Sequence, residues 1–162
     1  MWERALRQGV LAASGQPRVE AFVRTAPWTR RLVHRFVAGE TIADAIATVR
    51  AIAAQGMTST LDHLGENVAT DEAARAAAAT YGDVLRRMAA AGVEPCISVK
   101  LTMLGLAFDD RLPETLMASI LETARDISGF VRIDMEGSAY TEPTIAIAER
   151  LHARFPEQVG TV

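Results

Sequence analysis

Two kinds of hydrophobic pattern alternate along the chain after an N-terminal segment of about 35 residues. Short apolar runs rich in β-branched residues predict strands at 57–62, 96–101, 130–135 and 159–162, with a shorter candidate at 36–38. Alanine- and leucine-rich segments of helical length and period lie between them. Strands and helices that alternate in this way, with strand starts about 30 to 40 residues apart, are typical of right-handed βαβ units in a parallel sheet.

Local signals mark the ends of four predicted helices. We expect helices over 41–55, over 71–91, from Pro113 to just before Gly129, and over 143–154. The first three starts have a capping, acidic or proline residue in the first turn, and each of the four ends has a glycine or proline that stops the helix. These residues are Thr41 with Asp44 before Gly56, Asp71 with Glu72 before Gly92, Pro113 before Gly129, and Pro156.

The strands distinguish between two kinds of parallel sheet. Strands of an open, doubly wound sheet are covered by helices on both faces and read as continuous apolar runs. Here every second position is polar, so one face of each strand is polar and the other, mostly apolar, is expected to face a ring of helices. The polar set is Thr58, Thr60, Asp62, Ser98, Lys100, Arg132, Asp134 and Glu136, and the opposite set is Met57, Ser59, Leu61, Ile97, Val99, Leu101, Val131, Ile133 and Met135. A barrel with a partly polar interior fits this pattern better.

The chain is short for the barrel that it predicts. A complete (β/α)8 barrel of the TIM type typically needs about 250 residues, whereas this chain has 162. We therefore expect an α/β fragment of about four βα units, in which N-terminal helices over 1–35 precede the first half of a barrel over 36–162. The composition, 49% apolar and 23% charged, is that of a globular protein.

Charge is distributed unevenly between the N-terminal segment and the rest. Residues 1–35 contain seven arginines and two glutamates, while the rest of the chain contains ten basic and eighteen acidic residues. A transit peptide, a nucleic-acid contact or a contact with an anionic membrane could each use such a basic arm. Its arginines alternate with apolar residues, however, as they do on ordinary amphipathic helices.

Other classes of protein are disfavoured by missing features. The chain has no apolar run long enough to span a bilayer and no signal peptide, which predicts a cytoplasmic protein. It has no glycine-rich phosphate loop, and its basic arm lacks the aromatic residues of nucleic-acid binders. We expect the single cysteine, Cys96, to be a small buried hydrophobe, and His34 and His152 to lie on amphipathic helices.

Lysine use is the most informative feature of the composition. Sixteen of the seventeen basic residues are arginine, and the one lysine, Lys100, lies in the apolar run CISVKLTML. A compact ammonium on a flexible stem suits a site where an arginine fork does not fit. The alternative is that Lys100 extends to the barrel rim with no further role.

Titratable residues occur near the ends of three consecutive predicted strands: Asp62 with His63 at the first, Lys100 at the second, and Asp134 with Glu136 at the third. Barrel enzymes place their catalytic groups there. A salt-bridge network that only stabilises the barrel mouth is the alternative. A metal site is disfavoured because Asp62 and His63 are neighbours in a strand and point to opposite faces. We expect His63 to face a helix or a loop and to hydrogen-bond locally.

A series of segments in family order resembles the first half of proline dehydrogenase, the FAD-dependent (β/α)8-barrel family that oxidises L-proline to Δ1-pyrroline-5-carboxylate. They run from RFVAGET through TLDHLGE, ISVKLTMLGL and FVRIDMEGSAYT to VGTV, over about residues 30–162. The resemblance implies that Lys100 binds the substrate carboxylate, with Asp62 near it. It also implies that Asp134 is an active-site aspartate beside the flavin and that Met135 lines the FAD.

The resemblance also implies partners. These are L-proline and a quinone or another electron acceptor, with a peripheral contact at the inner face of the membrane, and no metal or nucleic acid. Gly137 stands where the family often has an acidic residue. Two other functions stay open: a non-catalytic half-barrel that acts as a structural or interaction module, and an aldolase-type barrel enzyme in which Lys100 forms a Schiff base.

Overall fold

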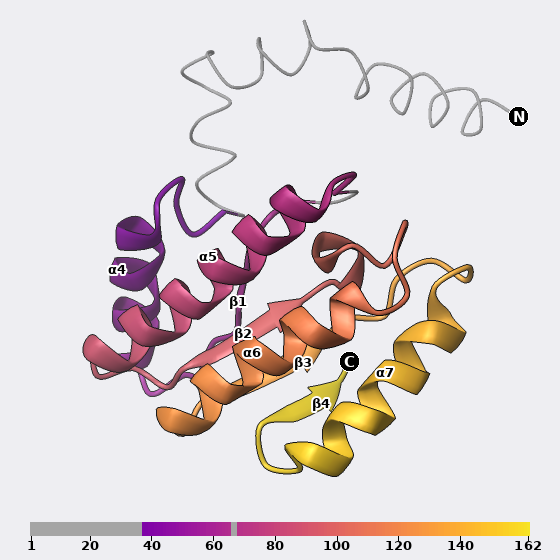
Figure 1. Cartoon of the computed structure of the whole chain (residues 1–162). Helices are drawn as coiled ribbons and strands as arrows, with labels where there is room; N and C mark the ends of the chain where they lie inside the picture. The colour runs from indigo at the N-terminus through magenta and orange to yellow at the C-terminus, as the bar shows by residue number, and fades with distance from the viewer. Residues whose placement is uncertain (1–36, 66–67) are drawn as a thin grey trace, which may run out of the picture. The chain divides into compact units, whose positions relative to one another are not determined.

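The computed structural model describes residues 37–65 and 68–162. The chain divides into two compact units, Met1–Asp44 and Ala45–Val162. The predicted arm over 1–35 and His34 lie outside the described residues, so their structure and the boundary between residues 35 and 36 stay predictions. The described elements, shown in Figure 1, are α4 (Ile42–Ala53), β1 (Leu61–Asp62), α5 (Asp71–Ala90), β2 (Cys96–Val99), η1 (Leu101–Leu104), α6 (Leu112–Asp126), β3 (Phe130–Ile133), α7 (Thr141–Arg154) and β4 (Val159–Thr161).

Four parallel strands form one sheet whose order, β1-β2-β3-β4, is the order of the strands in the chain. One row of register partners is apolar: Leu61, Ile97, Val131 and Val159. The next row along the strands, on the opposite face, is Asp62, Ser98, Arg132 and Gly160. The predicted α/β fold and the predicted division into an apolar and a polar face are therefore both found.

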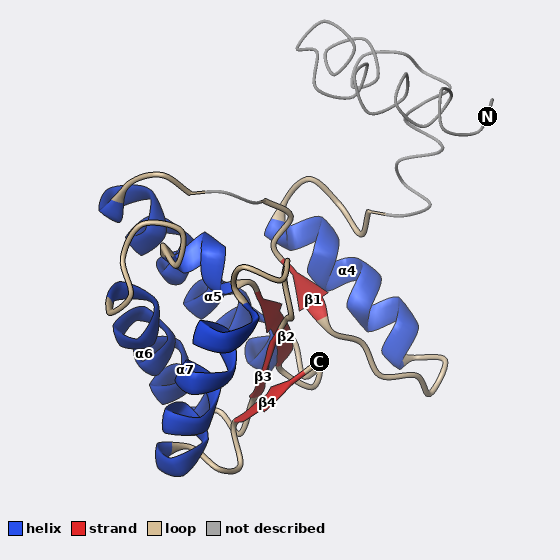
Figure 2. Ribbon diagram, turned by 90° about the vertical axis from the view of Figure 1, so that its right-hand side faces the viewer, coloured by secondary structure: helices blue, strands red, loops and turns tan. Residues whose placement is uncertain are grey.

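The hydrophobic core lies between the apolar face of the sheet and the helices. Helices α5, α6 and α7 lie on one side of the sheet in Figure 2. Ile97, Val99, Val131 and Ile133 are fully buried in this layer, where they meet apolar side chains of the helices such as Leu85. Burial of this row fixes the register, because a slip by one residue would place the polar row in the core.

The helix ends agree with the sequence signals to within about two residues, the usual uncertainty of helix boundaries. The Thr41 hydroxyl accepts from the Asp44 N–H at 3.2 Å, and the Thr70 hydroxyl accepts from the Ala73 N–H at the start of α5. Pro113 lies in the first turn of α6. Gly56 and Gly92, with φ of 76° and 71°, adopt the left-handed conformation that ends helices and that glycine tolerates best.

The strands are shorter than predicted. The first begins only at Leu61, because the register places 57–59 opposite the segment that ends in Pro95, which lacks the N–H that a ladder needs. Met57, predicted to face the helices, is 52% exposed. The second strand ends at Val99, where the 3-10 turn η1 begins, and the third ends at Ile133. The candidate strand at 36–38 is wrong for its two described residues, 37 and 38.

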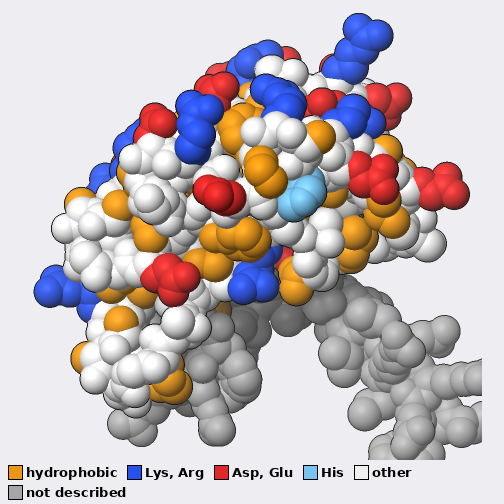
Figure 3. All heavy atoms as spheres, turned by 90° about the horizontal axis from the view of Figure 1, so that it is seen from below, with side chains coloured by type: hydrophobic (Ala, Val, Ile, Leu, Met, Phe, Trp, Pro, Cys, Tyr) orange, Lys and Arg blue, Asp and Glu red, His pale blue; other side chains and the backbone are white. Residues whose placement is uncertain are grey.

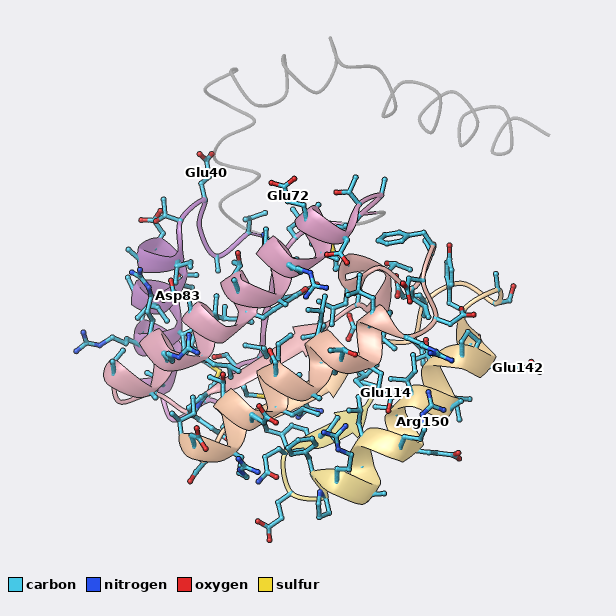
Figure 4. All side chains as sticks on the ribbon, in the orientation of Figure 1. Glu40, Glu72, Asp83, Glu114, Glu142 and Arg150 are labelled. Carbon is cyan, nitrogen blue, oxygen red and sulfur yellow. The ribbon has the colours of Figure 1, made fainter. Side chains whose placement is uncertain are left out.

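The exposed surface mixes charged residues of both signs. Figure 3 shows one face, on which acidic and basic side chains alternate with apolar ones. Between α6 and α7, Glu114 and Arg150 point toward each other in Figure 4 and form an ion pair of 2.9 Å. Among the described helices, none has the length and apolar character that a membrane span requires.

Candidate functional site

The carboxyl ends of the first three strands bring Lys100 between two aspartates. Lys100 follows β2 directly, Asp62 is the last residue of β1, and Asp134 follows β3. The Lys100 Nζ lies 3.0 Å from the Asp62 Oδ2 and 2.9 Å from the Asp134 Oδ2. These three residues, far apart in the sequence, therefore meet where the strand-end argument places them.

Water reaches this ion network only in part. The side chains of Lys100 and Asp134 are 23% and 22% exposed, and that of Asp62 is 37% exposed. Hydrogen bonds from the ammonium to Asp134 and then to Asp62 raise the pKa of Lys100 well above its ordinary value, although partial burial opposes this. The lysine is therefore a cation at neutral pH.

The Lys100 ammonium has more hydrogen-bond donors than the two aspartates use. An ammonium has three N–H donors, and two of those of Lys100 are used by carboxylates within the described part of the chain. The other carboxylate oxygen of Asp134 accepts a hydrogen bond from the Ser98 hydroxyl, which fixes the aspartate on the polar face of the sheet. The third N–H of Lys100 thus has no partner among the described residues, and an ammonium N–H of this kind can donate to an anion.

Glu136, the third acidic residue of the cluster, binds the backbone beyond Lys100 instead of the ammonium. Its carboxylate accepts hydrogen bonds from the N–H of Thr102, at 3.1 Å, and from the Thr102 hydroxyl. Thr102 is 2% exposed and lies in η1, the turn that starts after Lys100. Glu136 thereby links the segment after β3 to the turn after β2.

Tyr81, which no sequence pattern indicated as a site residue, packs against His63 near the charged cluster. Tyr81 of α5 is 1% exposed, and its ring meets that of His63 edge to face, with centroids 5.7 Å apart. Burial and the charges of Asp62, Asp134 and Glu136 raise the pKa of the Tyr81 hydroxyl, while the nearby backbone N–H of Lys100 opposes the rise.

His63 faces a helix, as predicted, but its expected local hydrogen bond is not found. Within the described residues, neither the His63 Nδ1 nor the Tyr81 hydroxyl has a partner that meets full hydrogen-bond geometry, and both atoms are buried. The only available signal for Tyr81 was an aromatic residue on the apolar stripe of the helix predicted over 71–91.

Met135, which the resemblance places against the flavin, lies after the end of β3 and is 40% exposed. The prediction that it faces the helices is wrong, because the chain has left the strand there. Its backbone N–H donates to the carbonyl of Val162 at 2.9 Å, so it stays at the carboxyl edge of the sheet. An exposed thioether beside Asp134 suits the apolar ring system and the polar edge of a flavin.

The other sequence candidates have simpler environments. Cys96 is buried, as predicted, and its sulfur lies 3.4 Å from the Thr60 hydroxyl. His152 lies exposed on α7. Over residues 37–65 and 68–162, no three histidine, cysteine or acidic side chains converge as metal ligands would.

A parallel sheet in chain order, with helices on one face and a charged cluster at the carboxyl ends of its strands, defines the chain as part of a barrel-type α/β protein. The family model described as proline dehydrogenase matches residues 45–162. The chain belongs to the proline dehydrogenase family, which is flavin-dependent.

Individual relatives agree with this assignment. The chain is 32% identical over 166 residues to proline dehydrogenase from Deinococcus radiodurans, an alignment that covers 100% of this chain and 53% of that protein. It is 34% identical over 134 residues to proline dehydrogenase 1 from Bacillus subtilis strain 168, covering 83% of this chain and 44% of that protein. The chain thus spans about half the length of the curated relatives that it matches.

A solved structure shows the same fold. The chain matches proline utilization A (PutA) from Bdellovibrio bacteriovorus, inactivated by N-propargylglycine, with a TM-score of 0.74 and 19% identity. The match covers 82% of this chain and 17% of that protein. The described strands and helices therefore correspond to part of the barrel of that protein.

Proposed function

We propose that the protein to which this chain belongs oxidises L-proline to Δ1-pyrroline-5-carboxylate with FAD. The observation that carries the proposal is the single lysine of a proline dehydrogenase family member, held at a strand end between two carboxylates with one N–H left for a ligand. The relatives named proline dehydrogenase support the same substrate.

In this proposal Lys100 binds the carboxylate of proline. Asp134 and Asp62 hold the ammonium at one point, so that the substrate enters a site that is already oriented. FAD would supply the two-electron acceptor: proline would give up a hydride from the carbon next to its ring nitrogen and a proton from that nitrogen as the C=N bond forms. Met135 and Asp134 are the residues of this chain that would contact the flavin.

The electron acceptor follows from the same proposal. A reduced flavin must pass its two electrons to a quinone or to another acceptor before the next turnover. We propose that this takes place in the cytoplasm, with a peripheral contact at the inner face of the membrane.

A Schiff-base role for Lys100 is less consistent with the geometry. A lysine that forms a Schiff base must lose its proton to become a nucleophile, and this usually requires a lowered pKa. Both aspartates instead raise the pKa of Lys100.

Kinetics of the protein that contains this chain test the proposal. Lys100→Met removes a charge-assisted hydrogen bond to the substrate, worth about 1.5 to 3 kcal/mol, so kcat/KM for proline should fall about 10- to 100-fold. Lys100→Arg should restore little, because the planar fork places its donors elsewhere. Arg87→Met, on the exposed face of α5, is the matched control and should leave kcat/KM unchanged.

Flavin content separates binding from chemistry in the same experiment. The flavin absorbance should be equal in the unchanged protein and in Lys100→Met, since the lysine is assigned to the substrate. A purified protein without flavin absorbance and without proline oxidation would favour the non-catalytic module. A Lys100→Met variant with normal kcat/KM would remove Lys100 from the substrate site.

A further inference from the structure

The position of the Lys100 side chain depends on its backbone as well as on the contacts of its ammonium. Its side chain has a flexible stem of four carbons, and the two aspartates restrain only the charged end. The backbone of Lys100 is extended, with φ of −91° and ψ of 127°, and forms the N-cap of η1. Any movement of this turn therefore moves the point from which the lysine side chain starts.

The start of η1 requires a hydrogen-bond acceptor from elsewhere in the chain. The first N–H groups of a helical turn have no partner within the turn, and the Lys100 side chain makes no capping hydrogen bond. The carboxylate of Glu136 accepts from both the N–H and the hydroxyl of Thr102. The residue that caps the turn thus comes from 34 positions further along the chain.

Asp134 and Glu136 belong to the same segment after β3, and they bind the two ends of the lysine environment. Asp134 binds the ammonium, and Glu136 binds the turn that follows the lysine backbone. One acidic segment thus restrains both the charged end of Lys100 and the turn that follows its backbone.

We infer that Glu136 is a positioning residue that acts on Lys100 through Thr102, because the pair fixes the turn after the lysine. The effect on proline binding rests on the function proposed above. The effect on the environment of Lys100 does not, and it can be measured without any substrate.

Thr102 offers two substitutions that separate its hydroxyl from its packing. Thr102→Val keeps the shape and loses the hydroxyl, whereas Thr102→Ser keeps the hydroxyl and loses a methyl group. The matched control is Thr144→Val in α7. Thr144 is also fully buried, and its hydroxyl has no hydrogen-bond partner among the described residues.

The single lysine provides a readout specific to this site. In the 162-residue chain labelled with ¹³C- and ¹⁵N-lysine, the side-chain NMR signals report on Lys100 alone, because its sequence has no other lysine. Thr102→Val should shift these signals, because the turn after Lys100 loses one of its two hydrogen bonds to Glu136. Thr102→Ser should return them to the original positions, and Thr144→Val should leave them in place.

Proline kinetics give the second readout. With Thr102→Val we expect KM for proline to rise about 3- to 10-fold with a smaller change in kcat, since a displaced Lys100 affects substrate binding most. Thr102→Ser should restore KM. If the protein does not oxidise proline at all, the proposed function fails, and the lysine signals still decide the role of Glu136.

Two results would overturn the inference. One is a set of lysine signals that Thr102→Val leaves unchanged. The other is a Thr102→Ser variant as altered as Thr102→Val, which would assign the effect to the methyl group. If Thr102→Val does not fold, Glu136→Gln and Glu136→Ala replace it: the amide oxygen of glutamine can still accept from the Thr102 N–H, so alanine should shift the lysine signals more.

Discussion

Replacing Lys100 by methionine tests how the charged cluster contributes to stability, apart from any role in substrate binding. The change removes an ammonium and leaves Asp62 and Asp134 facing each other. Two charge-assisted hydrogen bonds are lost, each worth about 1.5 to 3 kcal/mol in a protein interior. Because these side chains are between 22% and 37% exposed, water offsets much of that loss.

We therefore expect Lys100→Met to lower the free energy of unfolding by about 1 to 3 kcal/mol. For a protein of this size or larger, the corresponding fall in Tm is about 2 to 10 °C. In Lys100→Met the charges of Asp62 and Asp134 repel each other, and Asp134→Asn removes this repulsion. Asp134→Asn should therefore reduce stability less in the Lys100→Met background than in the original sequence.

Thermal and urea unfolding at neutral pH, followed by circular dichroism, measure both effects. Arg87→Met is the matched control, because the Arg87 pair with Asp83 is an exposed pair one helical turn apart, worth about 0.3 to 0.5 kcal/mol. If Lys100→Met has the same Tm as the unchanged protein, the ion network does not stabilise the fold. The same conclusion follows if Asp134→Asn lowers the free energy of unfolding equally with and without Lys100.

The same variants have an expected pH dependence. The folded state raises the pKa of Lys100, so the stabilisation from its charge is complete below the pKa of an unfolded lysine, about 10.4. It is lost as the pH rises through the higher value of the folded state. The difference in stability between the unchanged protein and Lys100→Met should thus stay constant from pH 7 to pH 9 and shrink in stronger alkali.

Two further predictions concern residues around the site. Gly105 closes η1 with φ of 100°, and a Cβ there would lie 2.9 Å from Phe108 Cζ, so Gly105→Ala should destabilise by about 1 to 2 kcal/mol in urea unfolding. Gly137→Ala, where a Cβ meets nothing within 4 Å, should stay within about 0.5 kcal/mol, and equal costs at both positions would contradict the argument. Tyr81→Phe removes a buried hydroxyl without a complete hydrogen bond, so it should raise Tm or leave it unchanged. A clear fall in Tm would mean that the hydroxyl bonds to His63 or to the Lys100 backbone in solution.

The helices could be predicted closely from the sequence because their ends depend on residues within one turn. Thr41, Pro113 and Gly92 act on their own neighbours, and the structure places them at helix ends. The meeting of Lys100 with Asp62 and Asp134 was also predictable, because parallel strands bring their carboxyl ends to one edge.

Strand lengths and the role of Glu136 could not be predicted in the same way. A strand ends where its neighbour stops offering backbone partners, and that neighbour lies one βα unit away in the sequence. The sequence pattern continues through Lys100 and Leu101, although the backbone turns there into η1. Without that turn, no pattern indicates that Thr102 would present both its donors to Glu136.

The order of the strands in the sheet sets an order of assembly during synthesis. Each strand pairs with the one made just before it, and the bonds of the site span only one βα unit: 38 residues for Asp62 with Lys100, and 34 for Lys100 with Asp134. A ribosome adds about 5 to 20 residues per second, so each partner emerges within seconds of the last. The lysine can be neutralised first by Asp62 and then fixed by Asp134, so its charge need not wait for the later part of the chain before it finds a partner.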